Sequence, residues 1–139
     1  MKLSIVMPVL NEADGIDAAL KALQIYRIHG VEIVVADGAS SDGTADMARG
    51  RADRVVSGLR GRGLQMNAGA VEARGDVLLF LHADTQLPAD ADRMVLDGLK
   101  RSGRAWGCFN VRISGGGGLR LVGLAMNLRS RLTVISTGD

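Results

Sequence analysis

Short apolar runs alternate along the chain with stretches in which apolar residues recur at helical spacing. The runs predict strands over residues 3–7, 31–36, 55–56, 76–81 and 106–113. The helical spacing predicts helices over 14–28, 44–51, 61–73 and 88–101, and a last helix over 119–132 after a glycine tether at 115–118. This alternation predicts an α/β fold, a mostly parallel sheet with helices on both faces.

Two of the predicted strands carry a further expectation about burial. The run at 76–81 is continuously apolar after its first residue, which is typical of a strand buried on both faces. Cys108 lies in the predicted strand 106–113, where we expect a small buried hydrophobe.

Composition limits the classes of protein to which the chain can belong. With 139 residues, 47% of them hydrophobic, it suits one domain over residues 1–139. The 17 basic and 15 acidic residues and the 3% aromatic content do not predict a nucleic-acid partner. The single cysteine excludes an internal disulfide. No apolar stretch is long enough to span a membrane, although 119–132 can be read as a helix at a membrane surface as well as a packing helix.

Polar side chains follow three of the predicted strands, at the edge where an open α/β sheet binds its ligand. They are Asn11 and Glu12 after the first strand, Asp37 and Asp42 after the second, and His82, Asp84 and Thr85 after the fourth. Gathered carboxylates repel one another unless a cation or hydrogen-bond donors join them. Asp42 also precedes a helical stretch, where helix capping explains an acid without any ligand.

The chain has neither of the glycine-rich phosphate-binding motifs, GxGxxG and GxxxxGK[ST]. A nucleotide site without such a loop must hold the base and ribose through side-chain acceptors, and must neutralise the phosphates with a divalent ion and basic groups. Asp37, Asp84 and Arg62 have the chemistry for these tasks.

Four sequence blocks carry a resemblance to a known family. They are residues 4–12 (SIVMPVLNE), 34–44 (VVADGASSDGT), 63–69 (GLQMNAG) and 79–85 (LFLHADT). In this order and spacing they resemble family 2 glycosyltransferases of the GT-A fold. The HADT form at 82–85 is similar to that of a bacterial subgroup of the family.

The resemblance implies transfer of a hexosyl-type sugar from a nucleotide-diphosphate donor to an acceptor hydroxyl, with inversion at the anomeric carbon. By motif position the nucleotide sugar would contact Pro8, Asn11, Glu12, Asp37, Arg62, Gln65, Asn67, Ala83 and Asp84. Asp84 matches the last acid of the family's DXD motif and would bind Mg²⁺ or Mn²⁺, with His82 in place of the first acid. The resemblance also implies a cytoplasmic protein, with a peripheral position at the inner membrane as an alternative.

The acceptor side of the family pattern is less complete in this chain. The family's general base is an acid beyond the donor half, whereas this sequence closes at 136–139 with what resembles the start of the acceptor-side loop. We therefore interpret the chain as a donor-binding half whose catalytic base is not identified. A nucleotide-binding fragment without turnover is one alternative. A sugar nucleotidyltransferase is another, although the glycine-rich basic loop expected after its first strand is absent, and a receiver-type module fits the strand-end acids less well.

Overall fold

The computed structural model describes residues 1–58, 60–110, 112–113 and 127. Its strands are β1 (Leu3–Val9), β2 (Glu32–Asp37), β3 (Arg54–Ser57) and β4 (Val77–Phe80). Its helices are α1 (Ala13–Ala22), α2 (Gln24–Ile28), α3 (Thr44–Ala48), α4 (Arg62–Glu72) and α5 (Ala91–Ser102). The chain divides into two compact units, residues 1–100 and residues 101–139. The elements that position the candidate site lie in the first unit.

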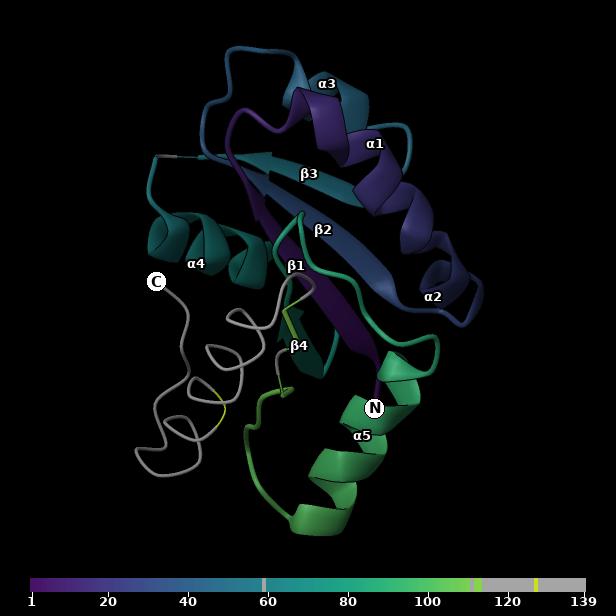
Figure 1. Cartoon of the computed structure of the whole chain (residues 1–139). Helices are drawn as coiled ribbons and strands as arrows, with labels where there is room; N and C mark the ends of the chain where they lie inside the picture. The colour runs from purple at the N-terminus through teal and green to yellow at the C-terminus, as the bar shows by residue number, and fades with distance from the viewer. Residues whose placement is uncertain (59, 111, 114–126, 128–139) are drawn as a thin grey trace. The chain divides into compact units, whose positions relative to one another are not determined.

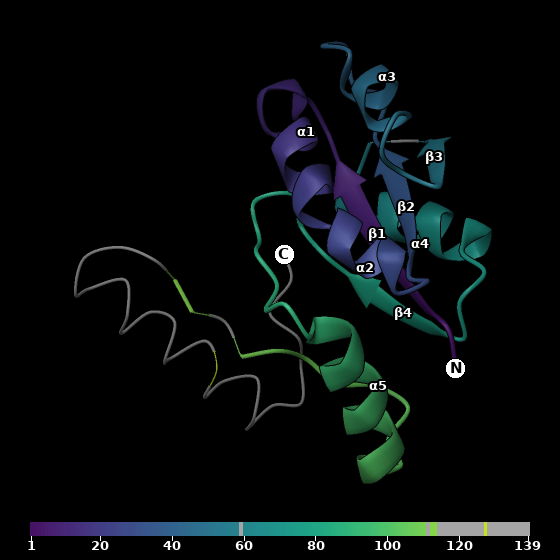
Figure 2. The ribbon, with the colours of Figure 1, turned by 90° about the vertical axis from the view of Figure 1, so that its right-hand side faces the viewer.

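The four strands form one sheet in the order β3-β2-β1-β4, and every pair is parallel (Figure 1). In Figure 2, α1 and α2 lie on one face and α4 on the other. The predicted α/β architecture is thus confirmed. The predicted helix 14–28 is divided at Leu23, which separates α1 from α2.

The core centres on β1 and β2, the two inner strands. Every residue of β1 is buried, and β2 is buried from its second residue onward. α4 packs closely on both strands at Gly69, where a Cβ atom would clash with the buried Val6 side chain and lie 3.3 Å from the Cβ of Ala36. Glycine is required there because the helix and the sheet approach closely.

Two expectations about the later strands are wrong. β4 alternates between half-buried and exposed residues rather than being buried on both faces, with Leu78 and Phe80 exposed, because it is an edge strand of the sheet that the described residues form. Among the described residues of 106–113 there is no strand, and Cys108 is exposed rather than buried. The tether 115–118 and all of the predicted helix 119–132 except residue 127 lie outside the described residues.

Pro8 lies within β1, where a missing backbone N–H would normally disrupt the sheet. The amide of Leu81 donates to the Val6 carbonyl at 3.0 Å, so the backbone of Val6 faces β4. Backbone direction alternates along a strand, so Pro8 faces the same side two residues later, beyond the end of β4 at Phe80. The ladder with β2 therefore loses no donor.

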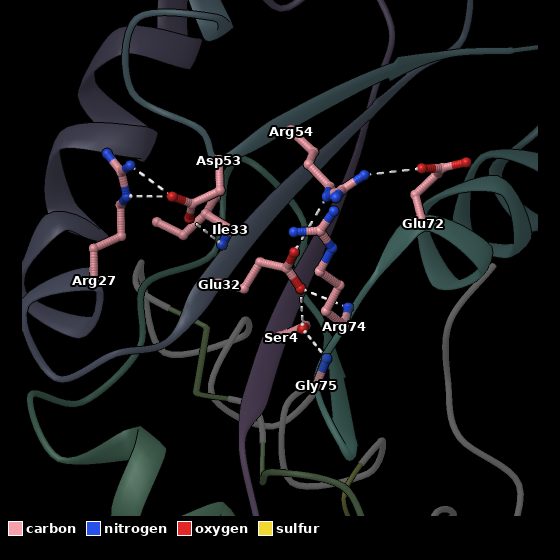
Figure 3. Close-up of polar contacts among 9 residues, drawn as sticks. All are labelled: Ser4, Arg27, Glu32, Ile33, Asp53, Arg54, Glu72, Arg74 and Gly75. Carbon is pink, nitrogen blue, oxygen red and sulfur yellow. Dashed lines mark hydrogen bonds and ion pairs between the residues drawn. The ribbon is translucent and has the colours of Figure 1, made fainter.

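A polar network crosses the amino ends of the strands (Figure 3). The buried Ser4 hydroxyl donates to Glu32 Oε2 at 2.5 Å and accepts the Gly75 amide at 2.9 Å. Arg54 pairs with both Glu32 and Glu72. Arg27 pairs with Asp53, which also accepts the Ile33 amide. These contacts give the buried polar groups at this edge of the sheet their hydrogen-bond partners.

Candidate functional site

The carboxyl ends of the inner strands meet at one edge of the sheet. Val9, the last residue of β1, pairs with Asp37, the last residue of β2, and Asp37 pairs with Ser57 at the end of β3. The loops that leave β1 and β2 therefore begin side by side. This is the edge at which the sequence predicts that Asn11, Glu12 and Asp37 converge.

Hydrogen bonds join the loop after β1 to the loop after β2. Asn11 donates its backbone amide to the Ser40 hydroxyl at 2.8 Å and accepts the Ser41 amide on its side-chain oxygen at 3.0 Å. The amide of Glu12 donates to the Thr44 hydroxyl at 2.9 Å. Asn11 adopts a positive φ of 53°, which asparagine tolerates better than most residues. The two loops thus form one hydrogen-bonded unit.

Asp42 connects this unit to two helices. Its Oδ2 accepts the amide of Ala13, the first residue of α1, at 3.0 Å, and its Oδ1 accepts both the amide and the hydroxyl of Thr44, the first residue of α3. The Thr44 hydroxyl and then the Ala13 amide lower the pKa of Asp42 below its ordinary value. The capping interpretation of Asp42 is confirmed, and one exposed carboxylate serves both helix starts.

Asp37 is the most enclosed acid of the group, with 2% of its surface exposed. Its Oδ2 accepts the Ser40 amide at 3.0 Å. Its Oδ1 is buried and has no hydrogen-bond partner among the described residues. A buried acceptor without a partner costs about 1–3 kcal/mol, so Asp37 retains an unsatisfied capacity to accept a hydrogen bond.

Gln65 lies under the same loops and is buried, at 5% exposure. Its side-chain nitrogen donates to the backbone carbonyls of Val9 and Ala36, at 2.5 and 3.2 Å. A Cβ atom on Gly38 would lie 2.7 Å from that nitrogen, so a side chain at position 38 would displace the Gln65 amide group from these carbonyls. The structure thus gives Gln65 a role that its sequence position did not suggest: it fastens α4 to the ends of β1 and β2.

The other predicted residues of α4 lie at the surface. Arg62 begins the helix and is exposed, on the same stripe as Gln65 because the two lie three positions apart. Asn67 is also exposed and lies about 200° around the helix from Gln65. The described contacts connect neither side chain to Asp37, so their predicted roles stay predictions.

His82, Ala83 and Asp84 follow β4 in a turn, where the Thr85 amide donates to the His82 carbonyl at 3.0 Å. Asp84 is exposed and accepts the Thr85 hydroxyl at 3.2 Å. Within the described part of the chain, no three His, Cys, Asp or Glu residues gather to hold a metal ion. One exposed carboxylate beside a histidine fits a hard cation that takes its remaining ligands from phosphate oxygens and water.

A cavity of about 650 Å³ lies at the opposite, amino edge of the sheet. Its lining includes Ser4, Arg27, Glu32 and Asp53, which belong to the network of Figure 3 and bond to one another or to backbone amides. We therefore interpret this region as structural. The strand-end loops carry an unsatisfied buried acceptor, Asp37 Oδ1, and the exposed acid Asp84, and they are the better candidate site.

The model of glycosyl transferase family 2 matches residues 4–134 of the chain. The chain belongs to glycosyl transferase family 2. The comparison with curated proteins gave no match.

Solved structures show the same GT-A fold. A glucosyl-3-phosphoglycerate synthase from Mycobacterium tuberculosis, in complex with Mn²⁺, UDP and phosphoglyceric acid, is 25% identical with a TM-score of 0.63, covering 96% of this chain and 50% of that one. The mannosyltransferase PcManGT from Pyrobaculum calidifontis, in complex with GDP-Man and Mn²⁺, is 26% identical with a TM-score of 0.62, covering 70% and 32%. TarS 1-349 from S. aureus is 23% identical with a TM-score of 0.63, covering 73% and 33%.

The family 2 chain spans between a third and a half of the length of these structures. In its described part, no helix is both long and apolar enough to cross a membrane. Sequence reasoning missed Ser40, Ser41 and Thr44, whose hydroxyls and amides join the two loops. They stand in the block 34–44 that carries the family resemblance, but nothing in that block indicated which groups they would bond.

Proposed function

We propose that the chain contains the donor-binding region of an inverting glycosyltransferase that takes a nucleotide-diphosphate sugar, assisted by a divalent cation. Membership of family 2 supports this reaction class. So do the complexes of the M. tuberculosis and P. calidifontis enzymes, which contain UDP or GDP-Man together with Mn²⁺. Hexosyl transfer, the bacterial HADT subgroup and a cytoplasmic or peripheral inner-membrane location belong to the same proposal.

The unsatisfied Oδ1 of Asp37 is the observation that carries the proposal. An acceptor at a strand end suits an imide N–H of a base or a hydroxyl of ribose, and binding such a donor removes the cost of the missing partner. That oxygen is buried. Binding therefore requires the segment after Asp37 to shift, and this segment includes the exposed Ala39, whose φ is 61°.

Other residues around the edge suit the remaining parts of the ligand. Asn11 and Glu12 come from the loop that is bonded to the segment after Asp37, and they would line the base and ribose together with Pro8. Arg62 stands exposed at the start of α4, where its charge and the positive helix end favour a diphosphate.

The metal part of the proposal concerns Asp84 and His82. Asp84 would supply a carboxylate ligand and His82 a second ligand. When bound, the divalent cation offsets the negative charge that develops on the leaving diphosphate. The exposed turn leaves Asp84 accessible to a ligand that arrives with its own phosphate oxygens.

Thermal unfolding with UDP, GDP, CDP and ADP, each with and without Mn²⁺, tests the proposal first, because a ligand that binds only the folded chain stabilises it. We expect one nucleotide to raise the melting temperature in a Mn²⁺-dependent manner. A panel without any shift would contradict the proposal.

The variant Asp37→Asn tests whether Asp37 Oδ1 accepts a hydrogen bond from the nucleotide. It keeps an oxygen for the Ser40 amide but places an NH₂ group where Oδ1 accepts, so we expect nucleotide affinity to fall at least about tenfold, or about 1.5 kcal/mol. Asp17→Asn is the matched control, because Asp17 is an exposed acid on α1 paired with Arg51. Equal affinities of Asp37→Asn and the control would remove Asp37 from the site.

Nucleotide binding without transfer is the second candidate, because the described loops offer Asp37 Oδ1 as an acceptor for a nucleotide while no described contact assigns a general base. The two candidates differ in one measurement. Transfer predicts release of nucleoside diphosphate from a nucleotide sugar over time, whereas binding alone predicts a thermal shift with no such release.

A further inference from the structure

The segment 82–87, which contains His82 and Asp84, is held at both of its ends. At the first end the Leu81 amide donates to the Val6 carbonyl at 3.0 Å. At the second end the Tyr26 hydroxyl of α2 donates to the Pro88 carbonyl at 2.6 Å. Tyr26 is 2% exposed, so its ring is fixed by packing and its hydroxyl has little freedom to leave this bond.

A second contact connects the residue that follows α2 to the first turn of α5. His29 Nδ1 lies 3.0 Å from Asp92 Oδ2, and Asp92 is 7% exposed in the first turn of α5. The other oxygen of Asp92 is buried without a partner among the described residues, so His29 supplies the one side-chain contact found for this carboxylate there. Losing it would leave the whole carboxylate unsatisfied, which makes the contact costly to break.

Tyr26 is suited to act as a permanent donor. Burial, and then the charges of Asp92 and Asp90, raise the pKa of its hydroxyl above the ordinary value. The group therefore stays protonated throughout the neutral range. The Pro88 carbonyl also accepts the Ala91 amide at 2.9 Å, so the same atom joins α2 to the turn that begins α5.

We propose that Tyr26, supported by the His29–Asp92 contact, is a positioning residue that holds Asp84 in place for a cation bound with a nucleoside diphosphate. The inference rests on the proposed function. A carboxylate on a freely moving loop must be ordered when the ligand binds, and this costs conformational entropy. Holding both ends of 82–87 beforehand reduces that cost, although neither Tyr26 nor His29 touches the ligand.

The test compares Tyr26→Phe with Arg27→Ala. The first variant removes only the hydroxyl, while the second breaks a contact of the same short helix with Asp53, away from 82–87. Titration calorimetry with UDP and with GDP, each in MnCl₂ and in EDTA, separates the metal-dependent part of the affinity from the rest. We expect Tyr26→Phe to lose about fivefold in MnCl₂ and less than about twofold in EDTA, with Arg27→Ala near wild type in both.

Amide hydrogen exchange supplies a readout that needs no ligand. We expect residues 82–87 to exchange faster in Tyr26→Phe than in the wild type, and at the wild-type rate in Arg27→Ala. His29→Ala keeps Tyr26 but removes the partner of Asp92 Oδ2, and it provides a second route to the same pattern if Tyr26→Phe does not fold.

The calorimetry and exchange results distinguish a failure of the positioning role from a failure of the proposed function. Equal losses in MnCl₂ and EDTA, or no loss in either, would overturn the positioning role while leaving the proposed function intact. Unchanged exchange at 82–87 would overturn it too. A wild-type chain that binds neither nucleotide under any condition would refute the proposed function itself, and one that binds equally in both buffers would refute its metal part; in both cases the inference falls with it.

Discussion

The substitution Gly69→Ala should destabilise the chain, although alanine favours helices. The new Cβ atom would stand well within 3.0 Å of Val6, a buried side chain too short to turn away, and 3.3 Å from Ala36. α4 must then move outward. Overpacking of this kind costs about 1–3 kcal/mol, and weakening the two bonds of Gln65 adds about 1–2 kcal/mol.

Helix propensity offsets part of this cost, because alanine is about 1 kcal/mol better than glycine in a helix. The net loss should therefore be about 2 kcal/mol in the free energy of unfolding. In a domain of this size that corresponds to a fall of about 8 °C in the melting temperature.

Urea unfolding followed by circular dichroism measures this change directly. Gly63→Ala is the matched control, since Gly63 belongs to the same helix and a Cβ there meets no atom within 4 Å. We expect Gly63→Ala to be unchanged or up to about 1 kcal/mol more stable. A Gly69→Ala chain as stable as the wild type would refute the close packing of α4 on β1 and β2.

Three further outcomes follow from the contacts described above. Asp42→Ala should lower the free energy of unfolding at neutral pH, and its difference from the wild type should shrink as the pH falls through the lowered pKa of Asp42. Urea unfolding at several pH values measures this difference, and a difference that stays constant would contradict the capping role. Ser4→Ala should cost about 1–3 kcal/mol of unfolding free energy, because Glu32 and the Gly75 amide lose their shared partner; denaturation that matches the wild type would contradict this. Asp84→Ala should abolish the Mn²⁺ dependence of nucleotide binding, and calorimetry that still shows this dependence would exclude Asp84 as a ligand.

The inner part of the fold could be predicted from the sequence because its signals are local. Strands β1 and β2 are continuous apolar runs followed by polar loops, and their burial matches that pattern. The region 106–113 also carries apolar residues, in loose alternation with polar ones, yet its described residues form no strand. Whether such a run becomes a strand depends on a partner strand, and composition does not supply that information.

The candidate site shows the same limit. The position of Asp37 at a strand end could be anticipated from the run of apolar residues before it. The inward turn of Gln65 could not, since it depends on the carbonyls of Val9 and Ala36 in two other elements. The double capping by Asp42 likewise depends on how close α1 lies to α3, which only the assembled fold determines.

Pro8 has a consequence for the strand beside it. In a parallel ladder, the bond from Leu81 to Val6 would be followed by one in which residue 8 donates to the carbonyl of Leu81. Proline has no hydrogen to donate, so pairing stops there and the chain leaves the sheet. Pro8 in β1 therefore determines where β4 ends. A residue with a backbone N–H at position 8 would allow β4 to lengthen, which would draw His82 and Asp84 into the sheet and shorten the turn on which the proposed cation ligands stand.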